Sequence, residues 1–273
     1  DSAAASVEVS NGALSIDSIV IDVAGEAATT SAQLTCTATA TDEDGGTPSI
    51  SYSWTNTTSG EALDPGAEDH TLQLDPLEAA PEDIIACEAT ATDGDGAMAT
   101  AVATVVLVNT PPSAAIVELS PDPAYTTDAL LAEASGSTDP DGGGEVSYAY
   151  AWYEGGVLTS ESGTSFPASG TVKNQTYTVV VTPSDGLGEG PESEASITVS
   201  NTAPSVDSVT IEAPDPLIST STLVCSASGS DADEDTLTMS YLWSNDSTGA
   251  SLDPGEDDTT LELISATVSP GDV

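Results

Sequence analysis

The feature that most constrains this chain is a segment that recurs along it. Ser200–Val209 (SNTAPSVDSV) echoes Val108–Ser113 (VNTPPS), and a fainter relative, Ser10–Ile19 (SNGALSIDSI), lies near the N-terminus. These segments stand about 90–100 residues apart, which is the length of one β-sandwich domain. A tandem array of small β domains usually serves as a spacer, a stalk or a fibre and seldom as a catalyst. The recurrence therefore predicts architecture before it predicts activity.

Within residues 14–108, apolar and polar residues alternate as they do in half-buried strands. Leu34–Ala40, Ile50–Trp54 and Ile85–Ala91 follow this period of two. Clusters of Asp, Gly and Pro separate the runs and predict turns between them. Many short strands with such punctuation predict an all-β chain of sandwich domains.

The recurrence divides the chain into four stretches. They are residues 1–13, 14–108 (the first repeat), 109–200 (the middle repeat) and 201–273 (the third repeat). Residues 1–13 match the terminal strand of a sandwich, as the end of a preceding domain or as a donor strand. The third repeat lacks counterparts of the last strands of the first. Either these residues are a window on a longer elongated array, or neighbouring chains complete one another by strand donation.

Net charge excludes two classes of partner. The chain has 46 acidic residues and one basic residue, Lys173, for a formal net charge of −45. No cationic surface is available to replace the counterions of nucleic acid, and an anionic membrane would repel the chain. No apolar run is long enough for membrane insertion. Because the acidic residues concentrate in turns between alternating apolar runs, we expect a folded chain rather than a disordered one.

Tryptophan and cysteine recur at matching places. Trp54, Trp152 and Trp243 are equivalent, and Cys36 and Cys225 precede two of them by about 18 residues. With Cys87, this Cys…Trp…Cys order resembles the immunoglobulin-like fold, in which the Trp packs on an inter-sheet disulfide. The resemblance implies a Cys36–Cys87 bridge and an oxidising compartment; two buried free thiols are the alternative. It also implies that the partner of Cys225 lies in the strands that the third repeat lacks.

The middle repeat departs from this pattern. Ala132 and Val179 stand where the resemblance places the two cysteines, and Tyr177 stands at the tyrosine-corner position, where the first repeat has Ile85. The strings Asp139–Gly142, Tyr150–Trp152 and Val179–Gly186 resemble PKD-like and cadherin-like repeats of bacterial extracellular surface proteins. Such repeats act as extracellular spacers, adhesin stalks or accessory modules. The Trp-Asp-Phe-Gly-Asp-Gly string of stricter PKD domains is absent.

Aspartates cluster in the loops that this fold places at one end of each sandwich, beside the entering linker. Oxygen ligands from several loops are what Ca²⁺ prefers, so a calcium site at each linker is one prediction. Asx turns at solvated loop tips are the alternative. The candidate metal ligands are Asp42, Asp44, Asp93 and Asp95 near Asn11, Asp139, Asp141 and Asp185 near Asn109, and Asp231, Asp233 and Asp235 near Asn201.

Other motifs are few. Asn56, Asn174 and Asn245 begin Asn-x-Ser/Thr sequons and are candidate glycosylation sites. His70 is the only histidine and has no nucleophile in motif context, so we expect no enzyme activity.

Taken together, these patterns predict a structural segment of an extracellular or cell-surface fibre, stalk or adhesin shaft. Its expected partners are neighbouring copies of itself or the rest of a longer parent chain. The alternative is a set of non-catalytic modules of a secreted protein that bind a carbohydrate or a cell-surface ligand. A glycan array would separate the two.

Overall fold

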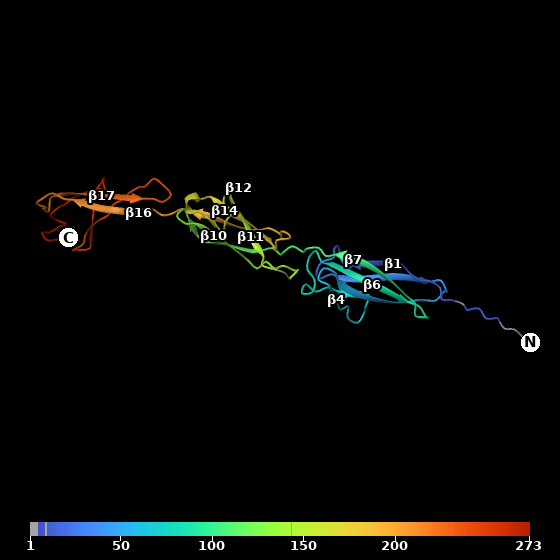
Figure 1. Ribbon diagram of the computed structural model, residues 1–273. Helices are drawn as coiled ribbons and strands as arrows, with labels where there is room; N and C mark the ends of the chain where they lie inside the picture. Colours follow the sequence, from blue (N-terminus) through green and yellow to red (C-terminus); the bar gives the residue numbers. More distant parts are fainter. Residues whose placement is uncertain (1–4, 9, 143) are drawn as a thin grey trace, which may run out of the picture. The chain divides into compact units, whose positions relative to one another are not determined.

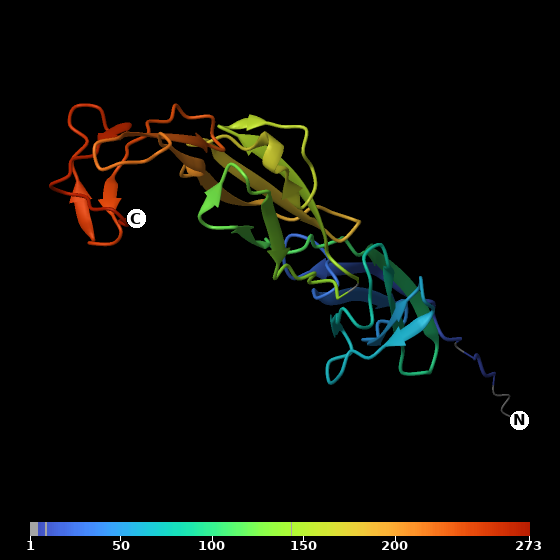
Figure 2. The ribbon, with the colours of Figure 1, turned by 90° about the vertical axis from the view of Figure 1, so that its left-hand side faces the viewer.

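The first repeat is built of β-strands (Figure 1 and Figure 2). They form two antiparallel sheets, whose strand orders are β1-β2-β5 and β4-β3-β6-β7. The computed structural model describes residues 5–8, 10–142 and 144–273. The strands are β1 Leu14–Val23, β2 Gln33–Asp42, β3 Ser49–Asn56, β4 Glu61–Leu63, β5 Thr71–Gln73, β6 Ile84–Thr92 and β7 Met98–Val106.

Alternation in the sequence gives each of these sheets one buried row of side chains. Leu34 and Cys36 of β2 are buried, and so are Ile85 and Cys87 of β6. The residues that alternate with Leu34 and Cys36 along β2 are half-buried or exposed. These four side chains belong to one core together with Trp54 of β3. The two sheets therefore pack as a sandwich, and the alternation of apolar and polar residues in the sequence predicts which side chains form its core.

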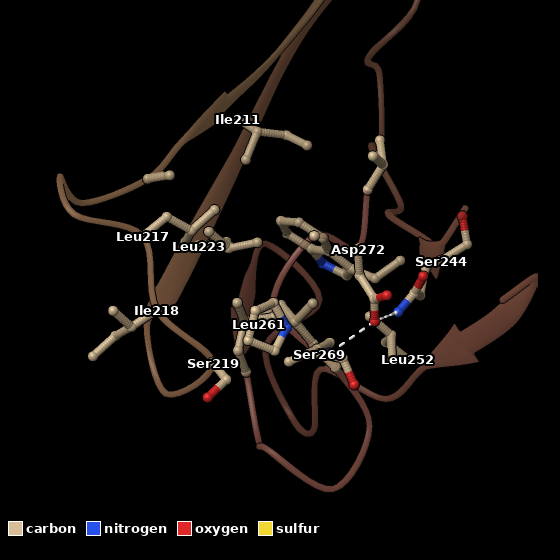
Figure 3. Close-up of a pocket in the computed structure, with 18 residues that line it drawn as sticks. Ile211, Leu217, Ile218, Ser219, Leu223, Ser244, Leu252, Leu261, Ser269 and Asp272 are labelled. Atoms are coloured by element: carbon tan, nitrogen blue, oxygen red, sulfur yellow. Dashed lines mark hydrogen bonds between the residues drawn. The ribbon is translucent and has the colours of Figure 1, made fainter. Parts of the chain in front are cut away.

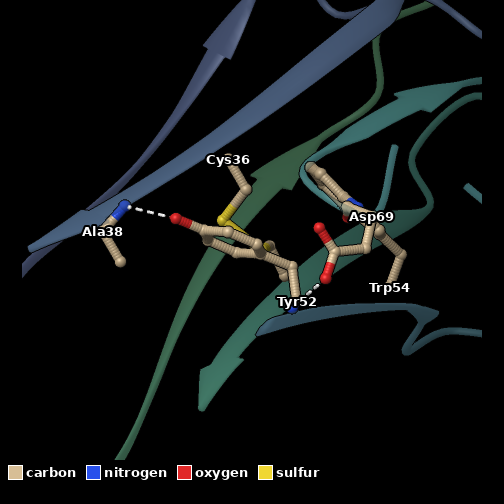
Figure 4. The surroundings of a disulfide bond; sticks show 6 residues. Cys36, Ala38, Tyr52, Trp54 and Asp69 are labelled. Atoms are coloured by element: carbon tan, nitrogen blue, oxygen red, sulfur yellow. Dashed lines mark hydrogen bonds between the residues drawn. A yellow bond between two sulfur atoms is a disulfide. The ribbon is translucent and has the colours of Figure 1, made fainter. Parts of the chain in front are cut away.

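The disulfide that the resemblance implied is present in the first repeat (Figure 4). Cys36 and Cys87 are bonded with a Cα–Cα distance of 6.5 Å, and both are buried. Cys87 lies opposite Trp54 in the β3–β6 ladder, so the bridge and the indole share the same core. The prediction of a Cys36–Cys87 bridge is confirmed.

The middle repeat also forms two sheets. Their orders are β13-β10-β8 and β12-β11-β14-β15-β9, and β9 pairs in parallel with β15 through Ala124 and Val199. A short 3-10 helix, η1 at Ala168–Gly170, precedes β14. The strands are β8 Ile116–Ser120, β9 Ala124–Tyr125, β10 Leu130–Ser135, β11 Ser147–Glu154, β12 Val157–Leu158, β13 Ser165–Phe166, β14 Thr176–Ser184 and β15 Ser193–Ser200.

Tyr177 forms the predicted tyrosine corner. Its hydroxyl donates to the carbonyl of Gly170 at 2.8 Å and accepts the backbone N–H of Val172 at 3.0 Å. The ring is fully buried, and this burial raises the pKa of the Tyr177 hydroxyl. The phenol thus joins β14 to the loop that precedes it.

The third repeat has two smaller sheets, β16-β17-β20 and β18-β19. The pairing of β16 with β17 repeats that of β1 with β2: Ile211 lies opposite Cys225 as Ile21 lies opposite Cys36. The described residues form no counterpart of β6 and β7 here. The strands are β16 Ser205–Glu212, β17 Thr222–Ser230, β18 Trp243–Asn245, β19 Ala250–Leu252 and β20 Thr260–Glu262.

The three tryptophans occupy equivalent positions, as predicted. Trp54, Trp152 and Trp243 are 1%, 0% and 7% exposed, respectively. Each indole N–H donates to a backbone carbonyl in a later loop, at 2.8–2.9 Å. The same residue therefore fills the core and ties down a loop in every repeat.

Residue contacts divide the chain into two compact units. One comprises Asp1–Val117, Ala134–Tyr150 and Val180–Glu194, and the other comprises the remaining residues. Because the middle repeat contributes to both, the boundaries at residues 108 and 200 stay a prediction. Residues 1–4 and 9 of the predicted terminal or donor strand lie outside the described residues, and residues 5–8 and 10–13 belong to no strand. Among the residues described, none forms a helix able to span a membrane.

Candidate functional site at the acidic linker loops

Each acidic loop is built on the same local turn. The first aspartate accepts, on Oδ1, the backbone N–H of a second aspartate two residues later, at 2.8–3.0 Å. The sequence left open whether these aspartates bind a metal ion or form Asx turns, and the Asx turn is present in all three repeats. The pairs are Asp42 with Asp44, Asp139 with Asp141, and Asp231 with Asp233.

The second aspartate of each turn holds the linker that enters the repeat. Its carboxylate accepts a backbone N–H from the linker residue that follows Asn11, Asn109 or Asn201. In the middle repeat the distance from Thr110 N to Asp141 Oδ2 is 2.6 Å. The three pairs are Gly12 with Asp44, Thr110 with Asp141, and Thr202 with Asp233. The predicted gathering of these loops at the linkers is thus seen in the contacts, whereas their role as metal ligands is not tested by them.

A threonine from the preceding repeat completes the arrangement twice. The Thr30 hydroxyl donates to Asp141 Oδ1 at 2.6 Å, and the Thr126 hydroxyl donates to Asp233 Oδ1. We call the aspartate, the linker N–H and the threonine hydroxyl the linker clamp. Each clamp lies within a single compact unit. Asp141 is only 4% exposed, so its charge is compensated by these two donors rather than by water.

The linker at residues 109–112 is also held by a second acidic loop. Asn109 donates its amide to Asp185 Oδ2 at 3.0 Å. Burial acts to raise the pKa of Asp185, but hydrogen bonds from Asn109 and from the N–H groups of Gly188 and Leu187 outweigh it, so this pKa is lowered. Gly142 adopts a φ of +74°, and a Cβ there would stand 3.1 Å from Pro76 Cβ. Asp185 therefore holds the linker from a second loop, while Gly142 lies beside Pro76 outside the linker.

The linker at residues 201–204 is held differently. Asn201 donates to the carbonyl of its neighbour Thr202 instead of to an aspartate. Lys173, the only Lys or Arg in the chain, pairs with Asp235. That hydrogen bond raises the pKa of the Lys173 ammonium, and the hydrogen bond from Thr126 lowers the pKa of Asp233. A protein cation thus stands at the acidic loop of the third repeat.

The first repeat holds residues 11–13 in the same manner. Asn11 donates its amide to Asp93 Oδ2 at 2.9 Å, and this bond lowers the pKa of Asp93. Asp95 donates its N–H to Asp93 Oδ1, and its own side chain is exposed at the loop tip. Asp93 and Asp185 therefore play equivalent parts, while Asp95 does not reach the linker.

Among the described residues, one aspartate cluster has a geometry that could hold a metal ion. Asp231, Asp233 and Asp235 each offer an oxygen, and these oxygens lie within 4.8 Å of one another. Asp231 Oδ2 is buried and has no hydrogen-bond partner. Among the described residues, the other predicted ligands form no such cluster.

Two of the three predicted glycosylation sites are at odds with the fold. Asn56 and Asn245 are 1% and 3% exposed. Their amide nitrogens, to which a glycan would be joined, donate to Asp83 at 2.7 Å and to Asp272 at 2.8 Å. Their carbonyl oxygens accept N–H groups two and three residues on, as buried Asx turns. We correct the prediction at both positions; Asn174 is exposed and stays a candidate.

The sequence interpretation missed the two clamp threonines. Thr30 and Thr126 each lie four residues before the buried leucines Leu34 and Leu130, which mark equivalent positions in the two repeats. This recurrence was the available signal. Thr30 is itself fully buried, and a buried hydroxyl requires a partner.

No protein-family model matches the chain, and no curated protein matches it in sequence. Similar solved structures include the FN1–FN3 domains of chicken CNTN1, at 15% identity and a TM-score of 0.32, covering 89% of this chain and 87% of that one. The N-terminal four Ig domains of Dscam1 isoform 9.44 give 12% identity and a TM-score of 0.33, with 71% of this chain and 46% of that chain covered.

The three N-terminal domains of the Highly Immunogenic Outer Capsid protein (Hoc) of bacteriophage RB49 are also similar. They share 19% identity and a TM-score of 0.28, covering 85% of this chain and 73% of that one. Likeness at these TM-scores carries no argument about function. The assignment of immunoglobulin-like sandwiches rests on the sheets, the tryptophans, the cystine and the tyrosine corner described above.

Proposed function

We propose that this chain is a structural segment of an extracellular surface fibre, stalk or adhesin shaft, of the PKD-like or cadherin-like kind. The recurring linker clamp is the observation that supports this proposal most directly. A clamp of two charge-assisted hydrogen bonds joins the linkers at residues 109–112 and 201–204 to the loops on both sides of them. A binding module needs one exposed ligand surface, whereas a load-bearing shaft needs the same joint at every linker.

The shaft acts by resisting bending at its linkers. Pro111, Pro112 and Pro204 fix backbone φ angles within them. The clamp aspartates then restrain the N–H group of the adjacent linker residue. The acidic surface keeps neighbouring shafts apart in solution. In this role the chain is not an enzyme, and its partners are copies of itself or the rest of a longer parent chain.

Weakening one clamp tests the proposal. Asp141→Asn and Thr30→Val each remove one of the two bonds at the first clamp, and Asp95→Asn is the matched control at an exposed loop tip. Residual dipolar couplings of backbone amides should fit one common alignment for residues 14–107 and 116–200 in the unchanged chain and in the control. The two clamp variants should require separate alignments.

A common alignment in the clamp variants would contradict the role of the clamp. Clear binding of the unchanged chain on a glycan array would favour the alternative, a carbohydrate-binding module of a secreted protein. The alignment measurement and the glycan array test different properties, so the shaft proposal and the binding-module alternative can each be contradicted separately.

We also propose that Ca²⁺ binds at Asp231, Asp233 and Asp235. The proximity of these three carboxylates and the unpartnered Oδ2 of Asp231 support this candidate. Addition of Ca²⁺ should raise the melting temperature of the chain, and Asp231→Asn should remove that increase. Equal melting curves with Ca²⁺ and with a chelator would exclude the site.

A further inference from the structure

An amide–carboxylate pair joins the end of β3 to the segment before β6 in the first repeat. Asn56 Nδ2 donates to Asp83 Oδ2 at 2.7 Å and to the carbonyl of Glu78 at 3.5 Å. The same carboxylate oxygen of Asp83 accepts the backbone N–H of Ala80 at 2.9 Å. Because Asn56 is only 1% exposed, these bonds replace the water that its amide would otherwise bind. The pair therefore holds the segment before β6 against the core.

The tyrosine corner of the middle repeat bonds the equivalent backbone groups with a single side chain. The Tyr177 hydroxyl accepts the N–H of Val172 and donates to the carbonyl of Gly170, five and seven residues before it. Ile85 replaces Tyr177 in the first repeat, and the same distances counted back from Ile85 lead to the two groups bonded there. The equivalent residues are Val172 with Ala80 and Gly170 with Glu78.

In both repeats this segment pairs with the strand that leads into the next linker. The Glu82 N–H donates to the carbonyl of Leu107, and the Leu107 N–H donates to the carbonyl of Asp83, both at 2.9 Å. In the middle repeat the Asn174 N–H donates to the carbonyl of Val199 at 2.7 Å. Glu82 and Asn174 both have a left-handed backbone, with φ angles of +70° and +63°, which persists only where the surroundings enforce it. The contacts at this corner thus stabilise the backbone that anchors the exit strand.

The amide–carboxylate pair recurs in the third repeat. Asp272 Oδ2 accepts Asn245 Nδ2 and the backbone N–H of Ser269, both at 2.8 Å (Figure 3). Hydrogen bonds from Asn245 and then from Ser269 lower the pKa of Asp272 and outweigh the opposing effect of burial. The middle repeat has Glu154 and Gln175 at the two positions of this pair. Within the three repeats, the pair is therefore seen where the tyrosine corner is not.

We propose that the Asn56–Asp83 pair replaces the tyrosine corner in the first repeat and locks the strand that leads into the next linker. A phenol hydroxyl donates one hydrogen bond and also accepts, whereas an amide and a carboxylate divide these two tasks. Asn56 supplies the donor for the carbonyl of Glu78, and Asp83 supplies the acceptor for the N–H of Ala80. The two locks are therefore interchangeable between repeats. This inference concerns the stability of single repeats and does not depend on the proposed shaft function.

A double-mutant cycle in the full chain tests whether the pair acts as a unit. Asp83→Ala should raise the unfolding equilibrium constant of the first repeat roughly tenfold, because the Ala80 N–H and the Asn56 amide lose their acceptor. Asn56→Ala should cost clearly less in that background than it does alone. Asp64→Ala is the control, because this exposed aspartate accepts the N–H of Gly66 in a local turn, and it should have little effect. Denaturant unfolding followed by amide signals of β6 measures all four variants.

A phenol grafted into the first repeat tests the exchange in one direction. Ile85→Tyr should destabilise the unchanged chain, because Ile85 is fully buried and both backbone groups are already bonded. In the Asp83→Ala chain the new hydroxyl can bond the freed N–H of Ala80. There Ile85→Tyr should instead recover part of the lost stability.

An amide–carboxylate pair grafted into the middle repeat tests the other direction. Tyr177→Ile should destabilise this repeat, because its two backbone groups lose the hydroxyl. Adding Glu154→Asn with Gln175→Asp should lower the unfolding equilibrium constant again by roughly fivefold, measured on amide signals of β14. The same two substitutions should give no such gain in a chain that keeps Tyr177.

Two results would overturn the proposal. Fully additive losses from Asp83→Ala and Asn56→Ala would show that the two side chains act separately. Failure of both grafts to recover stability would show that the pair and the phenol do not perform the same task. If Asp83→Ala prevents the first repeat from folding, the graft into the middle repeat decides alone.

Discussion

The first and middle repeats build the same core by different means. In the first, a cystine joins Cys36 to Cys87 and a small Leu72 packs nearby. In the middle, Ala132 and Val179 replace the cystine, and Phe166 takes the place of the leucine. The Phe166 ring stands 5.7 Å from Trp152 and 4.8 Å from Tyr177 between ring centroids. The middle repeat thus has a cluster of three aromatic rings and no cystine, so the same strand plan is stabilised by a covalent bond in one repeat and by packing alone in the other.

Removing the cystine should produce the largest difference between the two repeats. Cys36→Ala with Cys87→Ala opens a loop of 51 residues and should lower the free energy of unfolding of the first repeat by about 3–4 kcal/mol. The middle repeat should keep its stability because it has no cystine. Denaturant unfolding followed by amide signals of β6 and of β14 measures both at once. Equal losses in the two repeats would show that they unfold as one body.

Removing the tyrosine-corner hydroxyl should lower the stability of the middle repeat instead of the first, and by a smaller amount. Tyr177→Phe deletes the hydroxyl that bonds Gly170 and Val172 and leaves buried polar groups unpaired, at a cost of about 1–3 kcal/mol. Only the middle repeat should lose stability. Tyr125→Phe, at a ring that is 38% exposed, is the matched control and should change little. A loss confined to the first repeat would contradict this assignment.

Acid should affect both repeats slightly, through equivalent aspartates. The folded-state pKa values of Asp93 and Asp185 are lowered, so each carboxylate contributes stability above the ordinary aspartate pKa of about 4. That contribution is lost as pH falls through the lowered value. Melting temperatures between about pH 6 and pH 3 should fall less steeply for Asp185→Asn than for the unchanged chain. A carboxyl-carbon NMR titration in which Asp185 protonates at or above the ordinary aspartate pKa of about 4 would refute the assignment.

Much of the fold could be predicted from the sequence because its signals are local or repeated. Strand alternation is local, and the three tryptophans occupy positions that the period of about 90–100 residues makes visible. The Cys36–Cys87 pair and the role of Tyr177 followed from the resemblance to the immunoglobulin-like fold. The clamp could not be predicted in the same way. Thr30 and Asp141 are 111 residues apart in the sequence. No local sequence pattern around either residue indicates that the two form a hydrogen bond.

The prediction of glycosylation from the sequons was wrong for a related reason. The Asn-x-Ser/Thr pattern is read from three residues, but the fate of Asn56 is decided by Asp83, a partner 27 residues away. A short polar side chain at a strand end serves equally well as a surface acceptor or as a buried turn former. Only the tertiary contact distinguishes the two.

The clamp also bears on how such a chain can change its length. The middle repeat carries both a donor and an acceptor: it offers Thr126 to the clamp at the linker that follows and Asp141 to the clamp at the linker that precedes. Ser219 aligns with Thr126 and carries a hydroxyl at the same point of the third repeat. A repeat that carries both parts of the clamp can therefore be followed or preceded by another such repeat with the threonine, the N–H group and the aspartate present at each joint.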